Sequence, residues 1–387
     1  MRKQIKQFFE ADSASGIVLL VFLIFSLLIA NSPLGPAFAT MLEQPLGFDT
    51  AGVHLRYSVL QWINDGLMAV FFLMVGIEIK QELAHGQLSS ARKASLPFFA
   101  ALGGMLVPAG IYLFFNHGTE TVHGWGIPMA TDIAFAIGIL SILGKRVPVG
   151  LKVFLTALAI VDDLGAILVI AIFYTAELHA NYLLYALGLF ALMMFINRLG
   201  VKTISPYLIA GALMWYFIHH SGVHATIAGV LTAFTIPIKG HRPGHSPIQV
   251  VEHAISTPVN FFIMPLFALA NTNIRFEPGM IDGLTAPLGL GIIAGLFIGK
   301  PLGITLFSWM SVQFRLSVLP SGTNWLQIFS IGLMGGIGFT MSIFIALLSF
   351  NEIHFQTEAK FAILTASALS GIIGYLILKR LGKRYVR

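Results

Sequence analysis

Two adjacent aspartates, Asp162 and Asp163, lie in the middle of a predominantly apolar run at residues 151–174. Two more ionisable residues, Asp132 and Lys300, occupy similar apolar runs. A charged side chain at the centre of a membrane helix costs about 2.5–3.5 kcal/mol, so four would cost about 10–14 kcal/mol. That sum is comparable to the whole net stability of a typical protein. We therefore expect these groups to face one another or water, on the path of an ion or a proton.

The oxygens of Thr131 and of the three aspartates are ligands of the kind that hard cations prefer. Neighbouring helix positions point about 100° apart, so Asp162 and Asp163 cannot both aim at one point from a straight helix. One can bind a cation such as Na⁺ while the other pairs with Lys300. Burial disfavours the charged form of each group and brings proton exchange toward neutral pH. Because a protonated carboxyl group binds cations poorly, Na⁺ and H⁺ would compete for the oxygens of Asp163, Asp162 and Thr131. Competition at an alternately exposed site is sufficient for exchange.

The composition places these residues in an all-α polytopic membrane protein. Of the 387 residues, 56% are hydrophobic and only 10% are charged, whereas a soluble domain is about 25% charged. There is no cysteine, which excludes disulfides and thiolate metal sites. We expect no cofactor and no nucleic-acid partner. Hydropathy and turn residues predict about twelve transmembrane helices, at residues 13–31, 58–82, 95–116, 121–143, 149–174, 181–199, 203–218, 222–237, 248–271, 288–311, 325–350 and 358–380.

Lysine and arginine residues set the orientation of these helices. With the N-terminus inside, nineteen of the 23 basic residues fall in inside segments, three fall outside, and Lys300 lies within the membrane. This bias predicts that both termini are cytoplasmic. One outside segment, at residues 44–57, has the alternation of a β-hairpin. An isolated hairpin is marginal in water, so we expect it to lean on another surface, such as a second protomer.

Two of the predicted helices are interrupted. The fourth contains Pro128 and the pair Thr131-Asp132, and the eleventh contains Gly335, Gly336 and Gly338. Interruptions free backbone amides and carbonyls, which membranes tolerate only beside protein or a cavity. The two breaks correspond if residues 95–174 and 288–380 are three-helix repeats of opposite orientation, an arrangement typical of transporters. The single domain, 1–387, would then comprise this core, an interface region at about 1–82 and 181–271, and the hairpin.

Five motifs resemble those of NhaA-type Na⁺/H⁺ antiporters, and the similarity extends over nearly the whole chain. They are ALAIVDDLGA at 157–166, PMATDIAFAIG at 128–138, FFLMVGIEIKQEL at 71–83, SGVHATIAGV at 221–230 and GIGFTMSIFIA at 336–346. The resemblance implies an electrogenic antiporter of the bacterial inner membrane, which expels Na⁺ or Li⁺ in exchange for more than one H⁺. It also implies that the interrupted helices 4 and 11 cross each other.

The resemblance further implies a role for each matching residue. Asp163 matches the ion ligand, Asp162 matches the carboxylate that pairs with Lys300, and Thr131 and Asp132 match the pair at the break. The hairpin at 44–57 matches a dimer contact. The family's pH-response residues match Glu78, Glu82, Glu252 and His253 on the cytoplasmic side, and His224 toward the outside. The chain departs from the family pattern close to these pH-response residues, at Gln81, Gln249, Val250 and Ser256.

Two other classes of membrane protein also use membrane-embedded acidic residues. A cation channel would also use membrane-embedded acidic residues, but interrupted helices in inverted repeats favour alternating access. An intramembrane aspartyl protease would need a GxGD sequence, and Asp162-Asp163 is followed by Leu164-Gly165 instead. The sequence therefore predicts a secondary transporter and no enzyme, with a passive channel as the remaining alternative.

Overall fold

A computed structural model describes residues 14–50, 53–175, 178–240, 246–277 and 279–382. The chain divides into two compact units. Unit 1 comprises residues 1–21, 85–166 and 274–387, and unit 2 comprises residues 22–84 and 167–273. The division falls within the helices α2 (Ala14–Ala30) and α8 (Val149–Phe173). The terminal basic residues used to predict the orientation lie outside the described residues.

Unit 1 contains the helices that carry the two predicted interruptions. Besides parts of α2 and α8, its elements are η2 (Gln87–Ser89), α6 (Ala91–Asn116), η3 (Glu120–Met129), α7 (Ile133–Leu143), η4 (Gly144–Arg146), α14 (Met280–Gly283), α15 (Pro287–Ile293), η6 (Ala294–Gly299), α16 (Lys300–Gln313), α17 (Trp325–Gly335), α18 (Phe339–Ser349) and α19 (Ile353–Gly382). Here η2, η3 and η4 are 3₁₀ helices and η6 is a π-helix.

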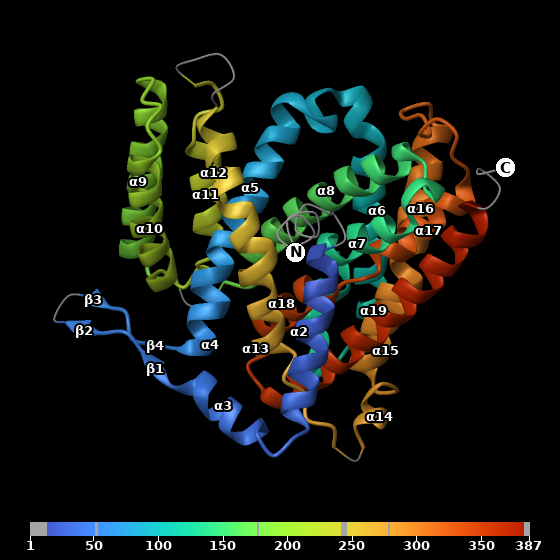
Figure 1. The fold of residues 1–387 in the computed structure, drawn as a ribbon, viewed down its shortest axis with the longest axis horizontal. Helices are drawn as coiled ribbons and strands as arrows, with labels where there is room; N and C mark the ends of the chain where they lie inside the picture. The colour runs from blue at the N-terminus through green and yellow to red at the C-terminus, as the bar shows by residue number, and fades with distance from the viewer. Residues whose placement is uncertain (1–13, 51–52, 176–177, 241–245, 278, 383–387) are drawn as a thin grey trace, which may run out of the picture. The chain divides into compact units, whose positions relative to one another are not determined.

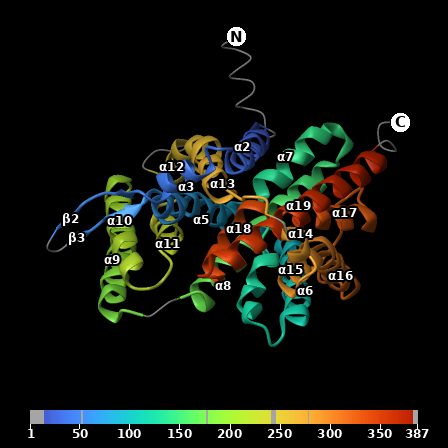
Figure 2. The ribbon, with the colours of Figure 1, turned by 90° about the horizontal axis from the view of Figure 1, so that it is seen from below.

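Unit 2 contains the hairpin and a second group of helices. Its elements are α3 (Gly35–Glu43), β1 (Pro45–Leu46), β2 (Asp49–Thr50), β3 (Val53–His54), β4 (Tyr57–Ser58), α4 (Val59–Gln61), η1 (Trp62–Leu67), α5 (Met68–His85), α9 (Ala180–Arg198), α10 (Ser205–His220), α11 (Ile227–Thr235), α12 (Pro247–Pro258), η5 (Val259–Ile263) and α13 (Met264–Asn271), with η1 and η5 as π-helices. Helices α9 and α10 run side by side (Figures 1 and 2). Buried residues such as Met193, Tyr207 and Met214 form their shared core.

The helices identify a multi-pass membrane protein. Among the described residues, eight helices are long and apolar enough to cross a membrane, or up to ten if each bent pair forms one span. Helices match all twelve predicted segments, but α10 and α11 have only 16 and 9 residues. A straight span needs about 20 residues. The structure therefore confirms the helical, membrane-embedded class and leaves twelve spans and the inverted repeats as predictions.

The predicted β-hairpin is present as two short antiparallel ladders. Pro45 and Leu46 pair with Ser58 and Tyr57, and β2 pairs with β3. The hairpin tip at residues 51–52 lies outside the described residues.

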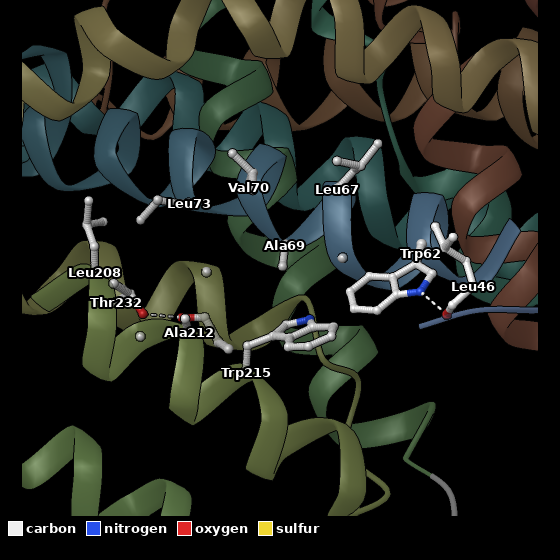
Figure 3. Close-up of a pocket in the computed structure, with 14 residues that line it drawn as sticks. Leu46, Trp62, Leu67, Ala69, Val70, Leu73, Leu208, Ala212, Trp215 and Thr232 are labelled. Atoms are coloured by element: carbon white, nitrogen blue, oxygen red, sulfur yellow. Dashed lines mark hydrogen bonds between the residues drawn. The ribbon is translucent and has the colours of Figure 1, made fainter. Parts of the chain in front are cut away.

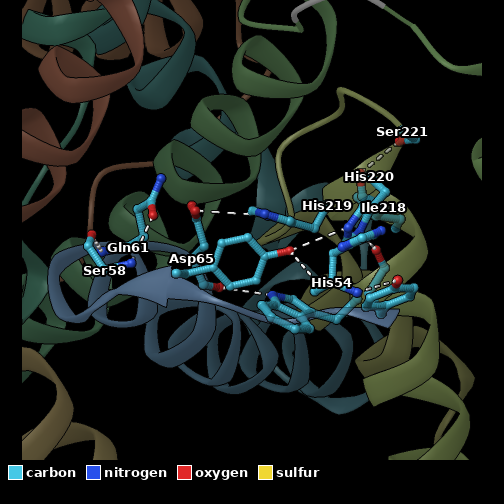
Figure 4. Close-up of polar contacts among 11 residues, drawn as sticks. His54, Ser58, Gln61, Asp65, Ile218, His219, His220 and Ser221 are labelled. Atoms are coloured by element: carbon cyan, nitrogen blue, oxygen red, sulfur yellow. Dashed lines mark hydrogen bonds and ion pairs between the residues drawn. The ribbon is translucent and has the colours of Figure 1, made fainter. Parts of the chain in front are cut away.

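The hairpin packs against helix α10 of the same chain. The backbone N–H of His54 donates to the Tyr216 hydroxyl at 3.4 Å, and the Tyr57 hydroxyl donates to the His54 carbonyl at 2.9 Å. The Tyr57 ring packs edge-on against His219, with 4.7 Å between centroids (Figure 4). Burial, followed by the nearby Tyr216 and Asp65, raises the pKa of Tyr57 to about 12.

Beside the hairpin, unit 2 contains an apolar cavity of 610 Å³. It is bounded by η1 and α5 on one side and by α10 and α11 on the other, with Trp62 and Trp215 at one end (Figure 3). The Thr232 hydroxyl in its wall donates to the Ala228 carbonyl at 2.7 Å, and the Trp62 N–H donates to the Leu46 carbonyl at 2.9 Å. The cavity offers a cation little besides hydrocarbon, so it is not the predicted ion site.

Helices α6 and α16 cross at two glycines in unit 1 (Figures 1 and 2). A Cβ atom built on Gly103 would collide with the Gly303 carbonyl oxygen, and one built on Gly303 would collide with the Gly103 carbonyl oxygen. The backbones therefore touch directly, as small residues allow in membrane helix packing. This contact fixes α16, whose first residue is Lys300.

Replacing Gly103 by alanine should destabilise unit 1, because backbone atoms cannot move aside as a flexible side chain can. We expect a loss of about 1–3 kcal/mol, typical of overpacking, measured as a lower melting temperature in detergent. Gly110→Ala is the matched control, since it lies on the same helix and its added Cβ would meet nothing within 4 Å. Equal melting temperatures for the two variants would contradict the close crossing.

Candidate ion-binding site

Both predicted interruptions are present, and each has a short non-helical segment. The 3₁₀ helix η3 ends at Met129, and α7 begins at Ile133. Helix α17 ends at Gly335, and α18 begins at Phe339 with a bend of 50°. Pro128 lies inside η3. Because η3 is a 3₁₀ helix, the first half of the fourth predicted helix is wound more tightly than an α-helix. Four backbone amides at each helix start and four carbonyls at each end thereby lose their intrahelical partners.

Asp132 serves the starts of both α7 and α18. One carboxylate oxygen accepts the Phe135 N–H at 3.0 Å, which caps α7. The other accepts the Thr340 N–H at 3.1 Å and the Thr340 hydroxyl at 2.5 Å. The Asp132 N–H also donates to the Ile337 carbonyl at 2.6 Å. Helix N-termini carry partial positive charge, so this carboxylate stabilises two of them at once.

Lys300 and Thr131 contact backbone carbonyls at the C-terminal ends of η3 and α17. The Lys300 ammonium is fully buried and donates to the carbonyl of Met129, the last residue of η3, and to Oδ2 of Asp162. The Thr131 hydroxyl lies 2.6 Å from Asp162 Oδ2 and 2.9 Å from the carbonyl of Gly335, the last residue of α17. A hydroxyl has one proton, so Thr131 donates to one of these acceptors at a time.

Glycines make the close approach of these elements feasible. A Cβ on Gly335 would lie 3.1 Å from Cδ1 of Ile304, and a Cβ on Gly104 would lie 2.9 Å from Cγ1 of Ile304. A Cβ on Gly336 would collide with the Leu296 carbonyl oxygen, and one on Gly338 would collide with the Ser342 hydroxyl. Gly336 and Gly338 have negative φ angles, so they are needed for space rather than for a left-handed backbone.

Asp162 and Asp163 are both buried on α8, with 1% and 3% of their surface exposed. Oδ1 of Asp162 has no hydrogen-bond partner among the described residues. Asp163 lies within electrostatic reach of Lys300. No group of three or more His, Cys, Asp or Glu side chains in the described part of the chain could hold a metal ion. A cation here would therefore need hydroxyl or carbonyl oxygens beside the carboxylates, and Thr131 offers one.

The pH-response candidates are all in unit 2 and do not form one cluster. Glu78 lies within electrostatic reach of Glu82 and Glu252. The side-chain amide of Gln81, one of the positions that depart from the family pattern, donates to Glu252 at 2.7 Å. His253 is exposed, and its ring contacts the Gln249 carbonyl at 2.7 Å. His224 precedes α11, at the end of that helix opposite to Lys80 and Glu78.

Sequence reasoning missed three residues that hold the breaks or a neighbouring helix. Thr340 contacts Asp132, and Ser367 contacts the start of α18. Lys80 donates to the carbonyls of Phe234 and Ile236 at 2.7 and 2.5 Å and so stabilises the end of α11. Thr340 lies inside the quoted motif GIGFTMSIFIA, which was a usable signal. The single serine and lysine carry no pattern that predicts their partners.

A buried acid–lysine pair in contact with an interrupted helix is typical of an ion-coupled secondary transporter. Comparisons with known proteins identify its family. A family profile described as Na⁺/H⁺ antiporter 1 matches residues 6–378, so the chain belongs to that family. This membership does not support the alternative of a passive cation channel.

Curated relatives cover the chain almost completely. The Na⁺/H⁺ antiporter NhaA 2 of Flavobacterium johnsoniae is 61% identical over 377 residues, which are 97% of this chain and 92% of that relative. The Na⁺/H⁺ antiporter NhaA of Flavobacterium psychrophilum is 50% identical over 97% of this chain and 95% of its own length. The antiporter of the same name from Bordetella parapertussis is 48% identical over 97% of this chain and 96% of its own length.

Removing either member of the Lys300–Asp162 pair should leave a buried charge without its partner. We expect Lys300→Ala to cost about 3–5 kcal/mol and to lower the melting temperature in detergent. Asp162→Asn, made in the Lys300→Ala background, should restore part of that loss because it removes the stranded charge. Strictly additive losses in the two single variants and the double variant would show that the pair does not interact.

Proposed function

We propose that this protein is an electrogenic antiporter of a bacterial inner membrane, exporting Na⁺ or Li⁺ in exchange for H⁺ with both termini in the cytoplasm. Family membership and relatives named as Na⁺/H⁺ antiporters support the exchange. The placement of lysine and arginine supports the orientation. Na⁺ and H⁺ are the cargo, and the proposal requires no resident cofactor.

The observation that carries the proposed mechanism is the environment of Asp162. Lys300 and Thr131 contact one of its carboxylate oxygens, while the other has no hydrogen-bond partner among the described residues. Asp163 is the next residue and is also buried. We propose that Na⁺ binds to Asp163 with oxygens from Asp162 and Thr131.

Competition between Na⁺ and H⁺ at this site supplies the coupling. Na⁺ attraction requires ionised carboxylates, and protonation removes both the charge and an acceptor lone pair. Na⁺ entry adds positive charge beside the Lys300 ammonium and weakens its hold on Asp162. Proton binding on the other side of the membrane then displaces Na⁺, and alternating exposure of the site turns this competition into exchange.

The two interruptions support alternating access by unit 1. They contact each other through Asp132, Ile337 and Thr340. We propose that residues 95–174 and 288–380 are inverted repeats that form the transport core. Residues 1–82 and 181–271 would form the interface region, where Glu78, Glu82, Glu252, His253 and His224 adjust activity to pH. The Glu78–Glu82–Glu252 proximity supports such a role for three of the five.

Titrating exchange with Na⁺ at several pH values, equal on both sides of proteoliposomes, tests the proposed mechanism. The half-saturating Na⁺ concentration should rise as pH falls, because protons occupy the same oxygens, and saturating Na⁺ should recover most of the rate. Asp163→Asn keeps the side-chain shape but loses charge and titration, so it should abolish Na⁺-driven proton movement while the protein stays folded.

Two outcomes would contradict this mechanism, and a third would contradict antiport itself. Wild-type exchange in Asp163→Asn would remove Asp163 from the ion site. A constant half-saturating concentration with a collapsing maximal rate would replace competition by a dedicated pH switch. A flux that an imposed pH gradient fails to reverse would contradict antiport itself.

We further propose that the hairpin at residues 44–57 holds a homodimer and that each protomer transports independently. Leu46 and Phe48 in this hairpin are exposed, at 59% and 58%, which supports a partner surface there. Deleting residues 46–55 should convert the dimer to a monomer in detergent while the exchange rate per protein stays within about twofold, because none of the proposed ion-binding residues lies in this segment. A deletion variant that remains dimeric would remove the hairpin from the interface.

A further inference from the structure

The first backbone amides of α18 are shared between two acceptors of different charge. The Ser367 hydroxyl on α19 accepts the N–H of Gly338 at 3.2 Å and the N–H of Phe339 at 3.1 Å. The next amide, of Thr340, donates to Asp132 at 3.1 Å. A hydroxyl oxygen has two lone pairs, so Ser367 can accept both amides at once. Its side chain is buried, as are Phe339 and Thr340.

This division leaves Asp132 balanced between the two interrupted helices. One of its oxygens binds the start of α7 through Phe135, and the other binds the start of α18 through Thr340. Without Ser367, the amides of Gly338 and Phe339 would face a dry interior, where an unsatisfied group is costly. Asp132 is the acceptor already present at this helix start, so the helix would gain by shifting toward it and drawing it away from α7.

We propose that Ser367 is a positioning residue for ion exchange, which fixes the start of α18 so that Asp132 remains shared by both interrupted helices. Ser367 contacts neither the Asp162–Lys300 pair nor Thr131 in the hydrogen bonds of the described residues. It acts through the backbone of α18, and it does so without adding charge beside a site that binds cations. This inference rests on the proposed exchange function.

Ser370 offers a matched control. It lies one helical turn further along α19, is fully buried, and its hydroxyl has no hydrogen-bond partner among the described residues. It also packs against the same break, because a Cβ on Gly336 would lie 2.8 Å from its hydroxyl. Ser370→Ala therefore removes the same atom from the same helix beside the same break, but without removing a hydrogen bond to α18.

The test measures Na⁺-dependent exchange per folded protein in proteoliposomes for the wild type, Ser367→Ala, Ser367→Thr and Ser370→Ala. We expect Ser367→Ala to lower the maximal rate about tenfold or more, because two buried amides, those of Gly338 and Phe339, lose their acceptor. The half-saturating Na⁺ concentration should change less than about threefold, because the proposed ion ligands are untouched. Ser367→Thr keeps the hydroxyl oxygen and should recover most of the rate, and Ser370→Ala should match the wild type.

Three results would overturn the inference. The first is a wild-type exchange rate per folded protein in Ser367→Ala. The second is an equal loss of maximal rate in Ser370→Ala, since either result would leave Ser367 only a packing role. A raised half-saturating concentration with an unchanged maximal rate would instead place Ser367 at the ion ligands. Since every comparison is made with an active wild type, these results differ from failure of the antiport proposal, in which the wild type itself shows no Na⁺-driven proton movement.

Discussion

The requirement that every backbone amide and carbonyl find a partner within the membrane governs the centre of this protein. An uninterrupted helix meets it internally, but two interrupted helices leave free groups at four ends. Asp132 and Ser367 accept the amides, and Lys300 and Thr131 donate to the carbonyls. The polar residues that make the interruptions tolerable thus include those proposed to bind and exchange ions.

Because the same residues satisfy the helix ends and form the proposed ion site, that site is sensitive to helix position. Lys300 contacts both a helix end, at Met129, and the carboxylate of Asp162. A change in the charge of Asp162 therefore alters the balance of forces at the end of η3. The direct backbone contact of α6 with α16 at Gly103 and Gly303 holds Lys300 against that change. The rigid crossing of α6 and α16 beside these polar contacts suits a protein in which small helix movements are proposed to carry an ion.

Local sequence patterns predicted the elements well. The runs of apolar residues located helices such as α6 and α8 within a few residues, and the alternation at 44–57 predicted the hairpin ladders. Proline and clustered glycines predicted both interruptions. These successes share a cause, since hydrophobic periodicity and turn residues act on neighbours in the chain.

Long-range choices of partner could not be predicted in the same way. Asp132 and Thr340 are separated by 208 positions, and Ser367 reaches Gly338 from another helix. A serine in an apolar helix ordinarily satisfies itself on its own backbone, so nothing local distinguishes Ser367 from Ser370. The 3₁₀ helix η3 and the π-helix η6 before Lys300 were not predicted either. Pro128 of η3 lies against Gly295 of η6, where an added Cβ would be 2.7 Å from Pro128 Cβ, and this contact also joins distant parts of the chain.

The single proton of the Thr131 hydroxyl has a consequence in time. Rotation of a hydroxyl proton requires no movement of the helix, whereas helix movements take microseconds to milliseconds. When Asp162 is ionised, it is the stronger acceptor, and the Gly335 carbonyl receives that proton less often. In the proposed mechanism, neutralisation of Asp162 by H⁺ or Na⁺ would turn the hydroxyl toward the Gly335 carbonyl and stabilise the end of α17. In the proposed cycle, the end of α17 would therefore respond to each change of bound cation before the slower helix movement begins.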